Sequence, residues 1–189
     1  MFSLFIDTHN ELIKIILFKD GKIIEKLEKE SSMQHSVYTM PMIEEILKNN
    51  NITPSNLNEI IVVNGPGSFT GVRIGVTIAK TMAYLLNIPI KSIDMLQIKS
   101  LFVNSDEKIV IESEKNGKYI GVFNKENNPI EEYTYLKNSE YEEYKNKKII
   151  NDIKDIDYEK VYEFIKDKKS ENPHGVNPIY IKKIGVQVW

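Results

Sequence analysis

Short apolar runs separated by turn-forming residues open the chain and predict a beginning rich in strands. The expected strands are Phe2–Ile6, Leu12–Phe18 and Lys22–Leu27, followed later by Glu59–Asn64 and Ile90–Ile93. Between them, apolar positions recur with the 3.6-residue period of a helix. The expected helices are about Gln34–Asn49, Thr70–Asn87 and Asp94–Asn104. The first half therefore predicts an α/β lobe that begins strand, strand, strand, helix, strand, helix.

The second half repeats this order of elements with weaker patterns and without residue-level identity. Its expected strands are Ile109–Glu112, Lys118–Phe123, Ile130–Leu136 and Lys148–Asn151, and its expected helices are Glu140–Tyr144 and Tyr158–Lys168. A duplicated βββαβα order predicts two lobes, each with a mixed sheet covered by helices. We place the boundary near residues 104–108, which gives an N-terminal lobe at 1–104 and a reduced C-terminal lobe with a tail at 105–189.

The two longest predicted helices carry more apolar surface than one sheet can cover. In the first helix, Tyr38, Met42 and Ile46 fall on one flank, and other apolar residues fill a second flank. The second helix is apolar at most positions, including Ile78 and Met82, and keeps only a polar stripe. This excess favours a protein interface, with a large core in a two-layer lobe as the alternative.

Small residues also recur along the second helix. Gly71, Gly75, Ala79 and Ala83 are spaced four apart, which lays their side chains along one face. Small side chains allow another backbone to approach closely. We therefore expect a partner helix to lie along this strip.

A glycine-rich turn, GPGSFTG at residues 65–71, precedes this helix. It departs from the Walker A loop because Gly71 is followed by Val72 rather than by lysine. It departs from the dinucleotide fingerprint because Gly67 and Gly71 are four residues apart. Free amides at the helix start still favour an anion, whereas the plainer interpretation is a tight turn that needs a positive φ.

The side chains that perform chemistry in other proteins are scattered here. The three histidines form no HxxxH or HExxH pair and the chain has no cysteine, so no metal site is expected. His35 is expected to be a capping or interface residue. Asp7 ends the first strand as a magnesium-positioning aspartate would, but the second half offers no glycine-rich loop for the far phosphates. Phosphoryl transfer needs both clamps, so we expect no catalytic residue.

Composition limits the function classes further. The 189 residues are 41% hydrophobic and 28% charged, as in ordinary globular domains. A formal net charge of −2 argues against a dedicated nucleic-acid-binding domain. No apolar run approaches bilayer length, and the N-terminus lacks the basic start of a signal peptide, so we expect a soluble cytoplasmic protein. We expect the apolar end, with Trp189, to pack back on the body.

Several motifs together resemble the TsaB family, once called YeaZ. They are FIDT at residues 5–8, QHS at 34–36 ahead of PMI at 41–43, NGPGSFTGVRIG at 64–75 and NPIYIK at 177–182. The resemblance is dense over residues 1–98, sparse from 99 to 175, and returns at the tail. It implies the two-lobed actin-like ATPase fold (ASKHA, ribonuclease H-like), which agrees with the duplicated order of elements.

The resemblance also implies a function. TsaB proteins are non-catalytic paralogues of the enzyme TsaD and support its transfer of a threonylcarbamoyl group to adenosine in tRNA. They pair with TsaD mainly through the two N-terminal-lobe helices, and TsaE, a small P-loop ATPase, joins the bacterial complex. For this chain we expect no chemistry of its own, tRNA contact through the complex, and no cofactor except a nucleotide at the interface with partner subunits. Alone, the chain is expected to form a homodimer.

Carried onto this sequence, the expected partner-binding residues are His35, Tyr38, Met42, Ile46, Gly71, Gly75, Ile78, Ala79, Met82 and Ala83. A vestigial phosphate loop is expected at Asp7, Thr8, Gly65, Gly67 and Ser68. The C-terminal lobe is shorter and more polar than is usual in the family, so contacts of that lobe with TsaE or tRNA are not carried over. Two alternatives stay open: a stand-alone ATP-binding hydrolase or kinase using Asp7 and the glycine turn, and an RNA-binding module using the C-terminal lysines.

Overall fold

The computed structural model describes residues 1–32, 34–146 and 149–182, and these form two compact units. Unit 1 comprises Met1–Met95 and Asp157–Pro178, and the described part of unit 2 comprises 96–156 and 179–182. This division differs from the predicted lobes at 1–104 and 105–189, because the segment Asp157–Pro178 packs with the N-terminal residues. The apolar end with Trp189 lies outside the described residues.

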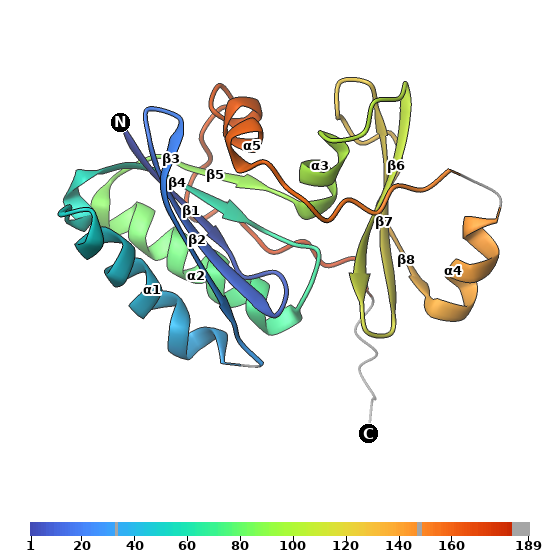
Figure 1. Cartoon of the computed structure of the whole chain (residues 1–189), viewed down its shortest axis with the longest axis horizontal. Coiled ribbons are helices and arrows are strands. Elements are labelled where there is room, and N and C mark those ends of the chain that lie inside the picture. Colours follow the sequence, from blue (N-terminus) through green and yellow to red (C-terminus); the bar gives the residue numbers. More distant parts are fainter. Residues whose placement is uncertain (33, 147–148, 183–189) are drawn as a thin grey trace. The chain divides into compact units, whose positions relative to one another are not determined.

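Unit 1 is built on a five-stranded mixed sheet (Figure 1). Its strands are β1 Phe2–Asp7, β2 Leu12–Lys19, β3 Lys22–Glu30, β4 Leu57–Val63 and β5 Ile90–Ile93. They lie in the order β3-β2-β1-β4-β5, with β1, β4 and β5 parallel and β2 antiparallel to both of its neighbours. This is the strand order of a ribonuclease H-like lobe, and it confirms the predicted fold class.

Helices cover both faces of this sheet because its strands alternate two sets of apolar side chains. Leu4 and Ile6 of β1 pack in the main core with α1, His35–Asn49, and α2, Phe69–Leu86. Phe5, from the opposite face, meets the ring of Tyr158, and Phe18 stacks on Tyr162, both from α5, Tyr158–Ile165. These aromatic contacts explain why α5 belongs to unit 1 rather than to the second half.

The boundaries of α2 follow from its end residues. The Ser68 side chain caps the helix by accepting a hydrogen bond from the Gly71 amide at 3.2 Å. Asn87 follows the last turn in the left-handed conformation, with φ 52°. Ser68 is thus the N-cap, one residue before the first residue of α2. None of the described helices combines the length and the apolar character needed to cross a bilayer.

Unit 2 is smaller and has a three-stranded antiparallel sheet. Its elements are α3 Met95–Ser100, whose first residue belongs to unit 1, β6 Glu107–Glu114, β7 Gly117–Asn124, β8 Thr134–Lys137 and α4 Asn138–Lys145. A short 3-10 turn, Pro54–Asn56, precedes β4 in unit 1. Where a fourth strand was predicted at Lys148–Asn151, the described residues form a single bridge, between Asn151 and Val110. The strand predicted from Ile130 begins only at Thr134: before it, the chain meets β7 in a single bridge between Pro129 and Phe123, and residues 130–132 are exposed.

Candidate functional site

The parallel strands of unit 1 end in polar residues at one edge of the sheet. Asp7 is the last residue of β1, Asn64 follows β4 and Asp94 follows β5. Ligands of open α/β sheets bind at the carboxyl ends of parallel strands. This edge, together with the glycine turn that follows Asn64, is therefore the place to test for a nucleotide site.

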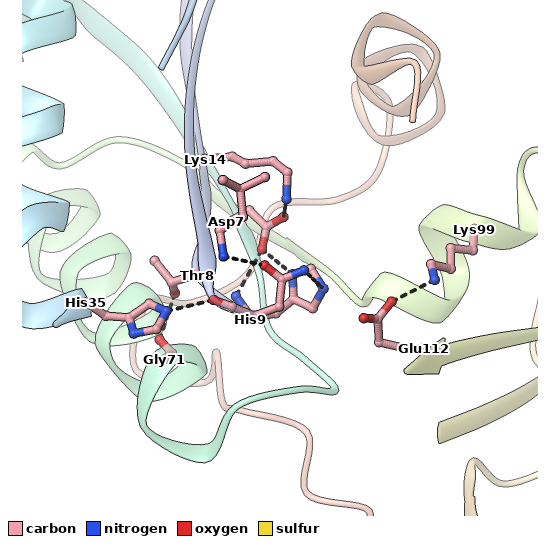
Figure 2. A network of polar contacts seen from close by, with 10 residues as sticks. Asp7, Thr8, His9, Lys14, His35, Gly71, Lys99 and Glu112 are labelled. Carbon is pink, nitrogen blue, oxygen red and sulfur yellow. Dashed lines mark hydrogen bonds and ion pairs between the residues drawn. The ribbon is translucent and has the colours of Figure 1, made fainter. Parts of the chain in front are cut away.

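Asp7 is fully buried and is bonded to the turn that follows it (Figure 2). Its Oδ1 accepts hydrogen bonds from the His9 amide at 3.1 Å and from His9 Nδ1 at 2.5 Å. Its Oδ2 lies 3.6 Å from Lys14 Nζ. Burial alone would raise the pKa of the Asp7 carboxyl, but the His9 ring and Lys14 outweigh burial and lower the pKa to about 2. The carboxylate is thus charged and already paired inside the chain.

The glycine turn holds an oxygen atom of the chain itself. The Ser68 amide donates to the His9 carbonyl oxygen at 2.6 Å, and a Cβ at position 67 would lie 2.1 Å from that same oxygen. Gly67 therefore permits a close approach by backbone, while Gly65 supplies the positive φ, 119°, that the turn needs. The predicted phosphate-loop residues do lie together here. The Ser68 amide, however, is already bonded to the His9 carbonyl oxygen, which occupies the position that a phosphate oxygen would need.

Two buried acceptor atoms at this edge also disfavour a phosphate. Asp7 Oδ2 and Asn64 Oδ1 have no hydrogen-bond partner among the described residues. Unpaired acceptors attract donors or cations and repel an anion. The residues present consequently do not fit a nucleotide phosphate at this turn, and the described side chains bring no three His, Asp or Glu together as metal ligands.

The small-residue strip of α2 faces the sheet of its own unit, which corrects the expectation of a partner helix along it. Ala79 and Ala83 are buried in the main core. A Cβ at position 71 would lie 2.3 Å from the Thr8 carbonyl oxygen, and a Cβ at position 75 would lie 2.2 Å from Thr8 Oγ1. The strip is small because α2 sits directly on the end of β1.

Three further residues predicted to bind a partner are buried inside unit 1. Met42 and Ile46 belong to the main core, and His35 is 4% exposed with its Nε2 donating to the Asn10 carbonyl oxygen at 2.7 Å. Helical periodicity identified an apolar flank of α1 correctly but could not tell that this flank covers the sheet. Tyr38, Ile78 and Met82 are partly exposed.

The exposed apolar residues of the two helices are mostly ones that sequence reasoning did not select. Val37 and Met40 of α1 are 56% and 38% exposed, and Tyr84 and Leu85 of α2 are 61% and 73% exposed. Phe69 is 43% exposed and lies under the Arg73 guanidinium. The missed signal is their place on each helical wheel, opposite the core-facing residues. We call Val37, Met40, Ile78, Met82, Tyr84 and Leu85 the helix-pair surface.

Comparison with known proteins identifies relatives of the first half of the chain. A family model described as tRNA N6-adenosine threonylcarbamoyltransferase, TsaD, matches residues 27–111, a segment that contains both α1 and α2. The chain is 41% identical over 97 residues to the tRNA threonylcarbamoyladenosine biosynthesis protein TsaB of Bacillus subtilis, which is 51% of this chain and 42% of that protein. The chain thus spans less than half the length of this relative.

Two other similarities extend over nearly the whole chain. A Mycoplasma pneumoniae protein named as an MG208 homolog is 26% identical over 191 residues, covering 96% of this chain and 95% of that protein. The solved structure of YeaZ from Pseudomonas aeruginosa superposes with a TM-score of 0.76 at 16% identity, over 95% of this chain and 100% of the other. The structural match shows that the two proteins share a fold, and the sequence matches show similarity over the stated residues. The chain therefore resembles the TsaB (YeaZ) family in the sequence of its first half and shares the fold of YeaZ over nearly its whole length.

Proposed function

We propose that this chain is a non-catalytic subunit of the machinery for tRNA threonylcarbamoyladenosine biosynthesis, and that it binds a TsaD-like catalytic paralogue through the helix-pair surface. The observation that carries the proposal is the exposure of large apolar side chains on α1 and α2. Among the described residues, half of the exposed large hydrophobic side chains lie on these two helices. α1 and α2 pack against each other, and exposed apolar side chains gathered on neighbouring helices are typical of an interaction site.

The family match supports the choice of partner. The segment that resembles the TsaD family, residues 27–111, includes both helices that carry the surface. A TsaD-like subunit is therefore expected to present a related pair of helices. Two related helix pairs can pack face to face about an approximate two-fold axis, as identical subunits do in symmetric dimers. By the same reasoning, a second copy of this chain occupies the surface when the catalytic subunit is absent.

The remaining roles are proposed at the level of the complex. A TsaE-like P-loop ATPase and tRNA would bind the assembled complex rather than the helix-pair surface. The complex would act in the cytoplasm. A nucleotide would be held at the joint interface with the partner subunits, because the residues at the glycine turn do not fit a phosphate.

Neither alternative function has comparable support. A stand-alone ATPase would need Asp7 for magnesium, but Asp7 is paired with His9 and Lys14. An RNA-binding module would need available lysines, but Lys166 pairs with Glu163, Lys145 with Glu142 and Lys182 with Glu114. These three ion pairs reduce the positive charge that the described C-terminal lysines offer to a phosphate backbone.

The test is the affinity of the chain for the TsaD-like subunit of the same organism, measured by isothermal titration calorimetry. Leu85→Glu combined with Met40→Glu places two charges on the helix-pair surface and should raise the Kd by about 100-fold or more. Ile130→Glu, on a residue of unit 2 that is 51% exposed, is the matched control and should leave the Kd unchanged. Equal affinities for all three proteins would refute the proposed interface.

A further inference from the structure

The turn between β1 and β2 contacts the N-terminal ends of both α1 and α2 (Figure 2). The Ser68 amide, at the N-cap of α2, donates to the His9 carbonyl oxygen at 2.6 Å. Thr8 Oγ1 donates to the Gly71 carbonyl oxygen, in the first turn of α2, at 2.7 Å. His35, the first residue of α1, donates from Nε2 to the Asn10 carbonyl oxygen at 2.7 Å. Residues 7–10, which we call the anchoring turn, thus bond to both helices.

The anchoring turn is itself fixed by hydrogen bonds of its own side chains. Asp7 Oδ1 accepts from both the amide and the ring of His9. Asn10 Oδ1 accepts from the Leu12 amide at 2.9 Å, and Asn10 Nδ2 lies 3.2 Å from His9 Nε2. Asp7, Thr8 and His9 are all at most 2% exposed. A buried turn with this many bonds has little freedom to change shape.

The fit between the anchoring turn and α2 leaves no spare room. Position 67 meets the His9 carbonyl, position 71 the Thr8 carbonyl and position 75 the Thr8 hydroxyl, each closer than a Cβ would allow. The three glycines therefore let residues 8 and 9 approach both the turn before α2, at position 67, and about one full turn of the helix itself, from position 71 to 75. Any displacement of the anchoring turn must displace the helix.

We infer that the anchoring turn sets the position of α1 relative to α2, and that Thr8 and His9 are positioning residues for the helix-pair surface although neither reaches it. This inference rests on the proposed function for its effect on binding, but its structural part does not. The helix-pair surface is divided between two helices separated by a strand in sequence, so a shift of one helix misaligns the two halves. The side chains of the anchoring turn would thereby act on partner affinity from inside the unit.

The experiment compares His9→Ala, His9→Asn, Thr8→Val and the control Thr39→Val in the full chain. Thr39 is buried in α1 and donates to the His35 carbonyl of its own helix at 2.6 Å, so its replacement removes a similar bond without touching the anchoring turn. Asn at position 9 can donate to Asp7 in place of the ring nitrogen. The readouts are the Kd for the TsaD-like subunit, the melting temperature, and amide hydrogen exchange of residues 68–72 and 35–39.

His9→Ala and Thr8→Val should each raise the Kd by about 10-fold relative to Thr39→Val at comparable melting temperature. Exchange should accelerate at the first turns of α1 and α2 in the His9→Ala protein and return toward the parent rate in His9→Asn. Unchanged exchange in these two segments for the folded His9→Ala protein would overturn the inference. An unchanged Kd for His9→Ala and Thr8→Val would also overturn it, provided that Leu85→Glu abolishes partner binding and so shows that the helix-pair surface is used. If Leu85→Glu itself leaves the Kd unchanged, the proposed function fails and the exchange measurement alone decides the role of the anchoring turn.

Discussion

Unit 1 and unit 2 are both α/β, but they are stabilised in different ways. The main core of unit 1 joins 18 buried apolar residues from the sheet, α1, α2 and the C-terminal segment. Unit 2 has two separate apolar clusters of four buried residues each. Three charged residues, Lys99, Lys108 and Glu112, are also buried there. Unit 1 also buries charged residues, Asp7, Glu59, Lys91 and Asp94, but beside a much larger apolar core. A small sheet buries less apolar area, so the polar contacts of unit 2 carry a larger share of its stability.

The sequence resemblance to the family lies mostly in the unit with the larger core. Most of the segment matched by the TsaD family model, residues 27–111, belongs to unit 1. The helix-pair surface depends on the continuous core beneath it, because that core fixes α1 and α2 on the sheet. Unit 2 carries no part of this surface, which allows it to be short and polar without loss of the proposed pairing.

The largest effect is expected from the buried ion pair of unit 2. Lys99 Nζ lies 2.8 Å from Glu112 Oε2 and donates to the Ile111 carbonyl at 2.8 Å (Figure 2). Lys99→Met removes the cation beside the buried Glu112 carboxylate and should lower the free energy of unfolding by about 3–5 kcal/mol. Urea denaturation measures the loss. Adding Glu112→Leu should recover most of it, and equal losses in the single and double variants would contradict the ion-pair account.

In unit 1 the next largest effect on stability is expected from the close contact between α2 and Thr8 at Gly71. Gly71→Ala places a Cβ 2.3 Å from the Thr8 carbonyl oxygen, an atom of the backbone that cannot rotate away. The helix must shift, at a cost of about 1–3 kcal/mol of unfolding free energy. Gly175→Ala is the control, because its Cβ would approach no atom closer than 3.3 Å. A neutral Gly71→Ala would show that α2 is not seated on β1 as described.

A smaller effect, dependent on pH, is expected at Asp7. Its pKa is lowered from 3.8 to about 2, so the folded state favours the carboxylate, and this contribution is present above pH 4 and lost as the pH falls toward 2. The shift corresponds to about 2 kcal/mol. Chemical denaturation of the parent and Asp7→Asn proteins should show a stability difference at pH 5 that shrinks by pH 2. A difference that is constant over this range would refute the assignment.

The smallest effect on stability is expected on the helix-pair surface itself. Leu85→Glu changes a side chain that is 73% exposed, so the unfolding free energy should change by no more than about 0.5 kcal/mol. A thermal melt at a concentration at which the parent chain is monomeric checks this. A large loss would mean that Leu85 serves the fold of unit 1 rather than binding.

Local patterns predicted most of unit 1. Strand alternation, the 3.6-residue helical period and the Ser68 cap each involve residues that are close in sequence. The elements β1–β5, α1 and α2 could therefore be located from the sequence alone. Which neighbour each helical face meets depends on contacts distant in sequence. The strip that includes Gly71 was therefore assigned to a partner although it packs on Thr8, and α5 was assigned to the second half although Tyr158 packs on Phe5.

The role of the anchoring turn was hidden for the same reason. His9 was grouped with two other scattered histidines, since nothing in its immediate sequence shows that its carbonyl oxygen reaches Ser68. The glycine turn resembles a phosphate loop because both need a backbone that an oxygen atom can approach closely. Only the fold reveals that the oxygen belongs to residue 9.

The central claim, that the exposed side of α1 and α2 binds a TsaD-like subunit, is tested most directly by hydroxyl-radical footprinting of the chain with and without that subunit, at a concentration at which the chain alone is monomeric. Met40, Tyr84 and Leu85 are exposed side chains on this surface, and Tyr180, 50% exposed in unit 2, is an internal control. Complex formation should lower the oxidation of Met40, Tyr84 and Leu85 several-fold and leave Tyr180 unchanged. Unchanged oxidation of all three surface residues in a fully formed complex would contradict the account.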